Sequence, residues 1–175
     1  VTNTTINGPA SLTNAAGRTL SLFSSTVNAP LVNDGTLITT GSSAIAGAFA
    51  NSASATLRVA QLDGCCSTAT LNVANGFTNA GLIELSNQTV NNYGGQLNVV
   101  GTLVNAVGAT IASLGGPTPG GSRGLATDLD NLGTLTVEAP LILSGAGATH
   151  QNSGTVDVSV ADLTILQSGA SPSFT

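Results

Sequence analysis

The sequence predicts an all-β fold, a single-domain parallel β-helix (β-solenoid) of about 7–8 coils that spans residues 1–175. The main observation is a recurring phrase: an apolar residue, any residue, then Asn, followed by a small or glycine-containing turn and a strand of alternating apolar residues. Its clearest copies begin at Leu31, Phe77 and Leu129. No segment shows the period of an amphipathic helix, and the abundant Thr, Val and Gly residues disfavour one.

The spacing of the Asn in this phrase gives the size of one coil. The seven positions are Asn14, Asn33, Asn51, Asn79, Asn105, Asn131 and Asn152. Successive members are 19, 18, 28, 26, 26 and 21 residues apart, which is typical of stacked solenoid repeats. We therefore expect coils of 18–28 residues, each forming one turn of a wound sheet.

The phrase also predicts which way its side chains point. Alternate residues of a strand face the same side, so Phe77 and Asn79 point the same way, as do Ile83 and Leu85. Because the apolar residue faces the core, the Asn faces it too, and its amide can bond the amides above and below. We interpret the seven residues as an Asn ladder. The glycine that often lies two residues after the Asn is expected to supply the φ angle of a tight corner.

Second strands lie between the phrases at residues 71–73, 97–99, 141–143 and 163–165, so each coil has at least two sheet faces. Stacked apolar rows are expected to stabilise the fold. The predicted inward residues are Leu12, Leu20, Leu22, Leu31, Leu37, Phe49, Leu57, Val59, Phe77, Ile83, Leu85, Leu103, Ile111, Leu129, Leu135, Val137, Val156 and Val158.

Two segments depart from the repeat and are expected to be loop insertions. Residues 115–124 are rich in Gly and Pro and have no strand pattern. They do not predict a phosphate-binding loop, which needs a following helix and usually a Lys. The other insertion, near residues 60–68, lengthens the coil between Asn51 and Asn79 and carries both cysteines.

The two cysteines are neighbours, Cys65 and Cys66, and the sequence leaves their state open. They can form a vicinal disulfide, link to another subunit or remain thiols. A disulfide in an exposed loop of a secreted protein is the favoured interpretation, and an intersubunit link is the second. Zinc requires four ligands, which two adjacent cysteines and one distant His do not supply. We expect no metal and no other cofactor.

Composition excludes two classes of partner. Charged residues make up only 6% of the chain, and three Arg against eight acidic residues give a net charge of −5. This balance supplies no attraction for a phosphate backbone, so nucleic acid is excluded. No apolar run approaches the roughly 20 residues that cross a bilayer, so membrane insertion is not expected. The Thr, Asn and Gly richness favours an extracellular protein whose export signal lies outside the visible chain.

Candidate catalytic residues are few. His150, the only His, occupies the phrase position held elsewhere by Leu31, Phe77 or Leu129, so we interpret it as a structural residue. Asp128 and Asp130 share one strand face and can in principle bind Ca²⁺ or act as paired carboxylates. Sugar-cleaving chemistry normally needs further acids, a basic group or aromatic platforms, and aromatics are only 3%. Solvent-facing aspartates are favoured, and no enzymatic activity is expected.

Two triplets fit the N-glycosylation acceptor pattern: Asn3-Thr4-Thr5 and Asn87-Gln88-Thr89. The pattern arises often by chance in a chain rich in Asn and Thr. Modification at Asn3 or Asn87 therefore stays open and depends on the source organism.

The phrase, its spacing and the Thr, Asn and Gly richness resemble bacterial extracellular parallel β-helix repeat proteins, the autotransporter passengers and filamentous-haemagglutinin-like adhesins. The resemblance covers nearly the whole chain. It implies a right-handed parallel β-helix, display at the cell surface, and a role in adhesion, cell contact or matrix formation. Such passengers are usually much longer than this chain, which favours either a fibre subunit or a segment of a larger fibre.

Both ends of the chain carry parts of the phrase. Val1-Thr2-Asn3 has its form, and Phe174-Thr175 match the first two residues of another copy. Uncapped solenoid ends expose unpaired backbone groups and invite strand addition by another copy. The expected assembly interface comprises Val1, Thr2, Asn3, Thr4, Thr5, Ile6, Ser173, Phe174 and Thr175.

The leading hypothesis is a non-enzymatic extracellular subunit of a head-to-tail cell-surface filament, with an adhesion, biofilm or matrix role and with itself as partner. The alternative is a segment of a large β-helical adhesin that binds a host or surface glycan. A minor alternative, ice binding, needs Thr pairs in successive coils, and Thr134 with Thr136 is one of three pairs that do not recur in this way. A polysaccharide lyase or hydrolase is disfavoured because Lys and clustered carboxylates are absent.

Overall fold

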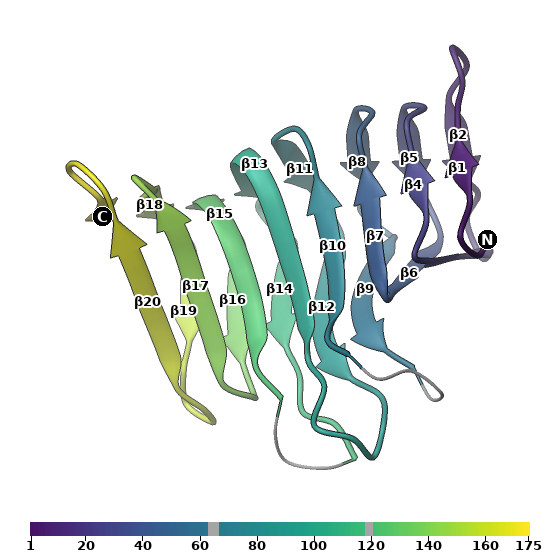
Figure 1. Cartoon of the computed structure of the whole chain (residues 1–175). Coiled ribbons are helices and arrows are strands. Elements are labelled where there is room, and N and C mark those ends of the chain that lie inside the picture. The colour runs from purple at the N-terminus through teal and green to yellow at the C-terminus, as the bar shows by residue number, and fades with distance from the viewer. Residues whose placement is uncertain (63–66, 118–120) are drawn as a thin grey trace.

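The computed structural model describes residues 1–62, 67–117 and 121–175. Within these ranges the chain forms strands and no helix. The strands stack into a parallel β-solenoid of about seven turns (Figure 1), with the two termini at opposite ends of the stack. The predicted fold class is confirmed.

Each coil contributes one strand to each of three rows, where the sequence predicted at least two faces. The first row, the Asn face, contains the recurring phrase. Its strands are β2 (Leu12–Asn14), β5 (Leu31–Asn33), β8 (Phe49–Asn51), β11 (Phe77–Asn79), β18 (Thr149–Asn152) and β21 (Ser173–Phe174), with the C-terminal parts of β13 (Gly95–Asn105) and β15 (Arg123–Asn131).

The second row, the Thr face, follows the Asn turn in each coil and forms a separate seven-stranded sheet. Its strands are β3 (Thr19–Phe23), β6 (Thr36–Thr40), β9 (Thr56–Gln61), β12 (Leu82–Asn87), β14 (Thr110–Ser113), β16 (Thr134–Val137) and β19 (Thr155–Asp157). In β6, β9 and β16 the alternate residues from the second position are buried, as the period of a strand requires.

The third row closes each coil. Its strands are β1 (Thr5–Ile6), β4 (Thr26–Val27), β7 (Ser42–Ile45), β10 (Ala69–Val73), β17 (Leu141–Ala146) and β20 (Leu163–Ser168), with the N-terminal parts of β13 and β15. The third face and the Asn face form one 14-stranded sheet because β13 and β15 run through the corner without a break. The register of β13 against β15 shifts between Asn98 and Thr102, where Gly101 adopts a φ of 89°. That φ favours glycine and allows the strand to bend.

The core is one continuous column of apolar side chains inside the three faces. Phe49 and Phe77 meet edge to face within it, with ring centroids 4.8 Å apart. Most predicted core residues are buried there, while Leu12, Leu20 and Val156 are half-buried in the terminal coils. The prediction for Val158 was wrong, since it is 50% exposed. Strand β19 ends at Asp157, so Val158 lies beyond the alternation that would have turned it inward.

The described residues shift the boundaries of both predicted insertions. Ala60 and Gln61 belong to β9, so the first insertion begins at Leu62, and Cys65 and Cys66 lie outside the described residues. The second was expected to reach residue 124, but β15 begins at Arg123. Arg123 is 1% exposed: its Nε donates to the Leu114 carbonyl at 2.9 Å and its Nη1 to the Gly121 carbonyl. These two hydrogen bonds tie the loop to the coil corner. Burial lowers the pKa of the guanidinium.

The glycines that follow the phrase have a different role from the one predicted. Gly81 and Gly133 do not adopt a positive φ. A Cβ built on Gly133 would instead lie 2.3 Å from the Ala109 carbonyl oxygen and 2.5 Å from that of Ala106, in the preceding coil. Glycine is needed here because neighbouring coils approach too closely for a side chain.

Replacing Gly133 with Ala is expected to lower the free energy of unfolding by about 1–3 kcal/mol or more, because the added methyl group meets backbone that cannot move aside. Chemical denaturation followed by circular dichroism measures the change. Gly115→Ala is the matched control, since its Cβ would meet nothing within 4 Å and its φ is not positive. Equal stability of the two variants would contradict the close approach seen here.

Candidate interaction surfaces

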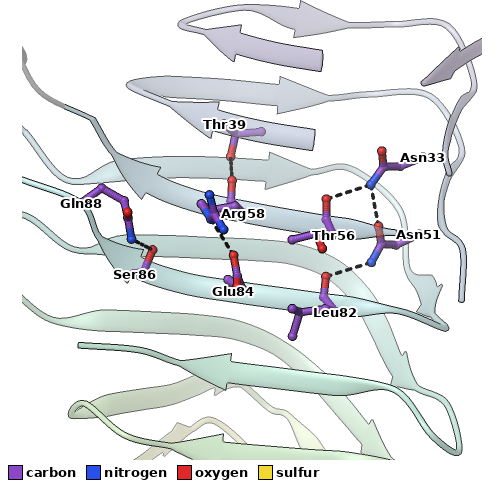
Figure 2. Close-up of polar contacts among 9 residues, drawn as sticks. All are labelled: Asn33, Thr39, Asn51, Thr56, Arg58, Leu82, Glu84, Ser86 and Gln88. Atoms are coloured by element: carbon purple, nitrogen blue, oxygen red, sulfur yellow. Dashed lines mark hydrogen bonds and ion pairs between the residues drawn. The ribbon is translucent and has the colours of Figure 1, made fainter. Parts of the chain in front are cut away.

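The Asn side chains form an unbroken hydrogen-bonded ladder along the Asn face. Each Nδ2 donates to the Oδ1 of the next Asn toward the C-terminus, from Asn14 to Asn152, over 2.7–2.9 Å. The same Nδ2 also donates to a main-chain carbonyl in the following coil, as Asn33 does to Thr56 and Asn51 to Leu82 (Figure 2). These bonds compensate the burial of the amides. The ladder is therefore a structural element with a direction along the axis.

The N-terminal segment does not join this ladder. Val1 donates its terminal ammonium to the Ser21 carbonyl at 2.7 Å, and Thr2 forms a parallel bridge with Phe23 of β3. Asn3 is exposed and has a φ of 47°. The resemblance of residues 1–3 to the phrase was thus misleading, because they pair with the Thr face.

The C-terminal segment does continue the Asn face. Strand β21 pairs with β18, so Phe174 lies in register with His150. The Thr175 amide donates to the His150 carbonyl at 3.0 Å, and the Asn152 amide donates to the Thr175 carbonyl at 2.7 Å. Phe174-Thr175 therefore occupy the first two positions of the phrase, as the sequence predicted.

The coil at the C-terminal end exposes apolar side chains. Val158, Val160, Leu166 and Phe174 are 50%, 70%, 53% and 42% exposed, respectively. Ile165 lies in register with the buried Leu143 of β17, so it faces the interior, yet it is 39% exposed. In the described residues, β19, β20 and β21 each pair with a strand on one side only. This end presents both free strand edges and uncovered core side chains.

The outer surface of the Thr face carries one column of threonines. In register it comprises Thr19, Thr36, Thr56, Thr110, Thr134 and Thr155, interrupted by Leu82. The neighbouring column is mixed and contains the Arg58–Glu84 ion pair, whose Nε–Oε2 distance is 2.5 Å (Figure 2). Among these seven strands, only β16 carries a Thr pair at alternate positions. A flat double array of Thr does not form.

A shallow groove follows the outside of the bend between the third face and the Asn face. Val100 and Gly101 line it on β13, Ala126 on β15, and Gly145 and Ala146 on β17. Its lining contains a single charged residue, Asp128, and no aromatic one. The groove mixes small, aliphatic and uncharged polar side chains.

The acidic and imidazole groups of the described residues lie at separate places on the solenoid, except for Asp128, whose charge acts on His150. Within the described part of the chain, no three His, Cys, Asp or Glu side chains lie together in a way that could hold a metal ion. An Asp128 oxygen accepts a hydrogen bond from the Thr149 amide at 3.3 Å, while Asp130 lies between the inward Leu129 and Asn131 and so points outward. His150 is fully buried. A hydrogen bond from Ser159 lowers the pKa of the exposed Asp157.

The two glycosylation triplets have different environments. Asn87 is fully buried: its Oδ1 accepts from the Thr89 amide at 3.0 Å, and its Nδ2 donates to the Asn91 carbonyl at 2.7 Å. The folded chain therefore does not present Asn87 to a modifying enzyme. Asn3 is exposed.

No protein-family model, curated protein or solved structure matches this chain. None of the described segments forms a helix long and apolar enough to cross a membrane.

Proposed function

We propose that the chain is a non-enzymatic structural subunit of an extracellular filament, in which copies stack head to tail along the solenoid axis. The observation that carries the proposal is the C-terminal coil, where strand edges without a second partner coincide with inward side chains left partly exposed. Parallel-strand edges of this kind bind another strand by backbone hydrogen bonding.

The direction of the Asn ladder supports stacking in one sense. Every amide along it donates toward the C-terminus. Two copies stacked in the same direction keep this order of donors and acceptors, whereas an inverted copy would oppose it. A contact between unlike ends does not close on itself and therefore generates a filament. Surface display and a role in adhesion, biofilm or matrix are part of the proposal and rest on composition and on the resemblance described above.

The interface can be tested with two neighbouring residues of β20. Ile165→Asp places a charge on the inward row that a stacked copy would cover, and is expected to weaken association by at least about tenfold. Leu166→Asp is the matched control, because Leu166 pairs with the outward Ser144 and stays outside the stack. Sedimentation velocity over a range of concentrations, with negative-stain microscopy, measures the effect.

Deletion of Val1–Ile6 provides a second test, at the N-terminal end of the solenoid. These residues pair only with β3 and β4, along the outer edge of the stack. The deletion is expected to abolish filaments and leave the monomer folded. Filaments unchanged by both Ile165→Asp and the deletion would refute the proposal. A wild-type chain that stays monomeric at every concentration would favour the alternative, a segment within a longer β-helical adhesin.

A further inference from the structure

His150 occupies a position where neither ring nitrogen faces water. It lies on the Asn face in the column that contains Leu129 below it and Phe174 above it. The side chain is 0% exposed. Its ring meets the Phe174 ring at an angle of 62°, with centroids 6.2 Å apart. An imidazole thus replaces the aliphatic or aromatic side chain that other coils place in this column.

The hydrogen bonds of the ring require its neutral form. Nδ1 accepts from the backbone amide of Leu129 at 3.2 Å, so the proton of the neutral ring is assigned to Nε2. Nε2 is buried and has no hydrogen-bond partner among the described residues. Protonation would convert Nδ1 from an acceptor into a donor that faces another donor, the Leu129 amide.

The charged groups around His150 offer little compensation. On β15, Asp128 favours the charged ring but is already bonded to the Thr149 amide, and Asp130 points outward. Arg123 lies at the opposite end of β15 and donates to carbonyls of the corner loop. Strands β16, β17, β18, β20 and β21 carry no other titratable side chain, and Asp157 of β19 is exposed.

We propose that His150 is an acid-sensitive latch, whose protonation releases β21 and loosens β18 at the C-terminal end of the solenoid. Strand β21 depends on this coil: its amides at Ser173 and Thr175 donate to the carbonyls of Ala148 and His150. A charged ring beside Phe174 cannot accept the hydrogen bond from the Leu129 amide. It also needs hydration, which only opening of the end coil provides. The inference concerns the single chain and does not depend on filament formation.

The sign of the pH effect follows from the direction of the shift. Burial lowers the pKa of His150 below its ordinary value of 6.5, and Asp128 opposes this only in part. The folded coil therefore binds fewer protons than the unfolded coil just below pH 6.5. Stability of the end coil is fully present above that pH and is lost as the pH falls through the folded-state pKa.

Hydrogen exchange at single amides tests the latch. Between pH 7.5 and 5.5, after correction for intrinsic exchange rates, protection at Leu129, Asn152 and Thr175 is expected to fall several-fold. Protection at Asp34 and Ser52, whose amides bond carbonyls of the N-terminal coils, should stay unchanged. The carboxylates ordinarily titrate below about pH 5, and His150 is the only His, so it is the side chain whose ordinary pKa falls within this window.

His150→Leu, which installs the residue found at Leu31 and Leu103 of the same column, should abolish this pH dependence. Titration of the single imidazole by NMR in the wild-type chain provides a readout that does not depend on the variant. A folded-state pKa at or above its ordinary value would overturn the proposal. So would an equal acid loss of protection in His150→Leu, or in all coils together.

Discussion

Replacing Asn79 with Asp is expected to lower the free energy of unfolding at pH 7 by about 3–5 kcal/mol, the cost of a buried charge without a partner. Asn79 is fully buried in the middle of the ladder. Its Nδ2 donates to Asn105 Oδ1 at 2.9 Å and to the Gly81 and Thr110 carbonyls at 3.1 and 3.3 Å. In the variant, a carboxylate oxygen would face these three acceptors, so three attractive contacts become repulsive.

An Asn→Asp substitution on the outside of the solenoid separates the effect of burying a charge from the effect of losing an amide. Asn72 lies on β10, is exposed, and its Oδ1 accepts a bond from Asn98 Nδ2 at 2.9 Å. Asn72→Asp keeps that acceptor in water and is expected to change stability by less than about 0.5 kcal/mol. Burial raises the pKa of the new carboxyl above that of an ordinary Asp, so part of the Asn79→Asp deficit should be recovered as the pH falls from 7 toward about 4.

Guanidinium denaturation followed by circular dichroism measures both variants, since the chain has no Trp. An Asn79→Asp protein as stable as the parent at pH 7 would show that the ladder amide is not required in the interior. Loss of the C-terminal coils alone would appear as a second transition, because solenoid repeats interact mainly with their neighbours.

Replacing Phe77 with Ala is expected to cost about 3–5 kcal/mol, the range for removing an aromatic ring from a packed core. Phe77 is 5% exposed, contacts Phe49 edge to face and lies in register with Leu103. The cavity would open in the middle of the column, where coils on both sides prevent collapse. The ring pair adds a contribution beyond area burial, which is lost with it.

Thr78→Ala, the next residue along β11, is the control because its side chain points outward and is exposed. It should change the unfolding free energy by less than about 0.5 kcal/mol. Denaturation midpoints under the same conditions compare the pair. A cost below about 1 kcal/mol for Phe77→Ala would show that its ring does not contribute to the packed core.

The fold and the Asn ladder could be predicted because their signals are local. A strand turns every second residue to the same side, so an apolar residue two before an Asn identifies the inward row. The repeat of that pair at 18–28 residues then sets the coil. The same logic placed Phe174 in the first position of a phrase. It failed for Asn3, because a three-residue match does not say which face a terminal segment pairs with.

Other features depend on neighbours along the axis, which one coil of sequence does not reveal. The sequence predicted Arg123 to be a loop residue, yet its guanidinium is buried at the coil corner, where it bonds the Leu114 carbonyl. Gly133 reads as a turn residue, yet the carbonyls of the coil beside it exclude a side chain. Asn87 reads as an acceptor for glycosylation, yet it is buried at the end of β12.

The sequence by itself determined that this protein winds into parallel coils and which apolar side chains line most of them, because both follow from alternation and repeat length. Only the tertiary structure decided that each coil has three faces, that two of them join through β13 and β15, and that His150 has a buried nitrogen without a partner. Those properties arise from stacking. Whether a group is covered depends on the coil above and below it, and that contact is made between residues far apart in the chain.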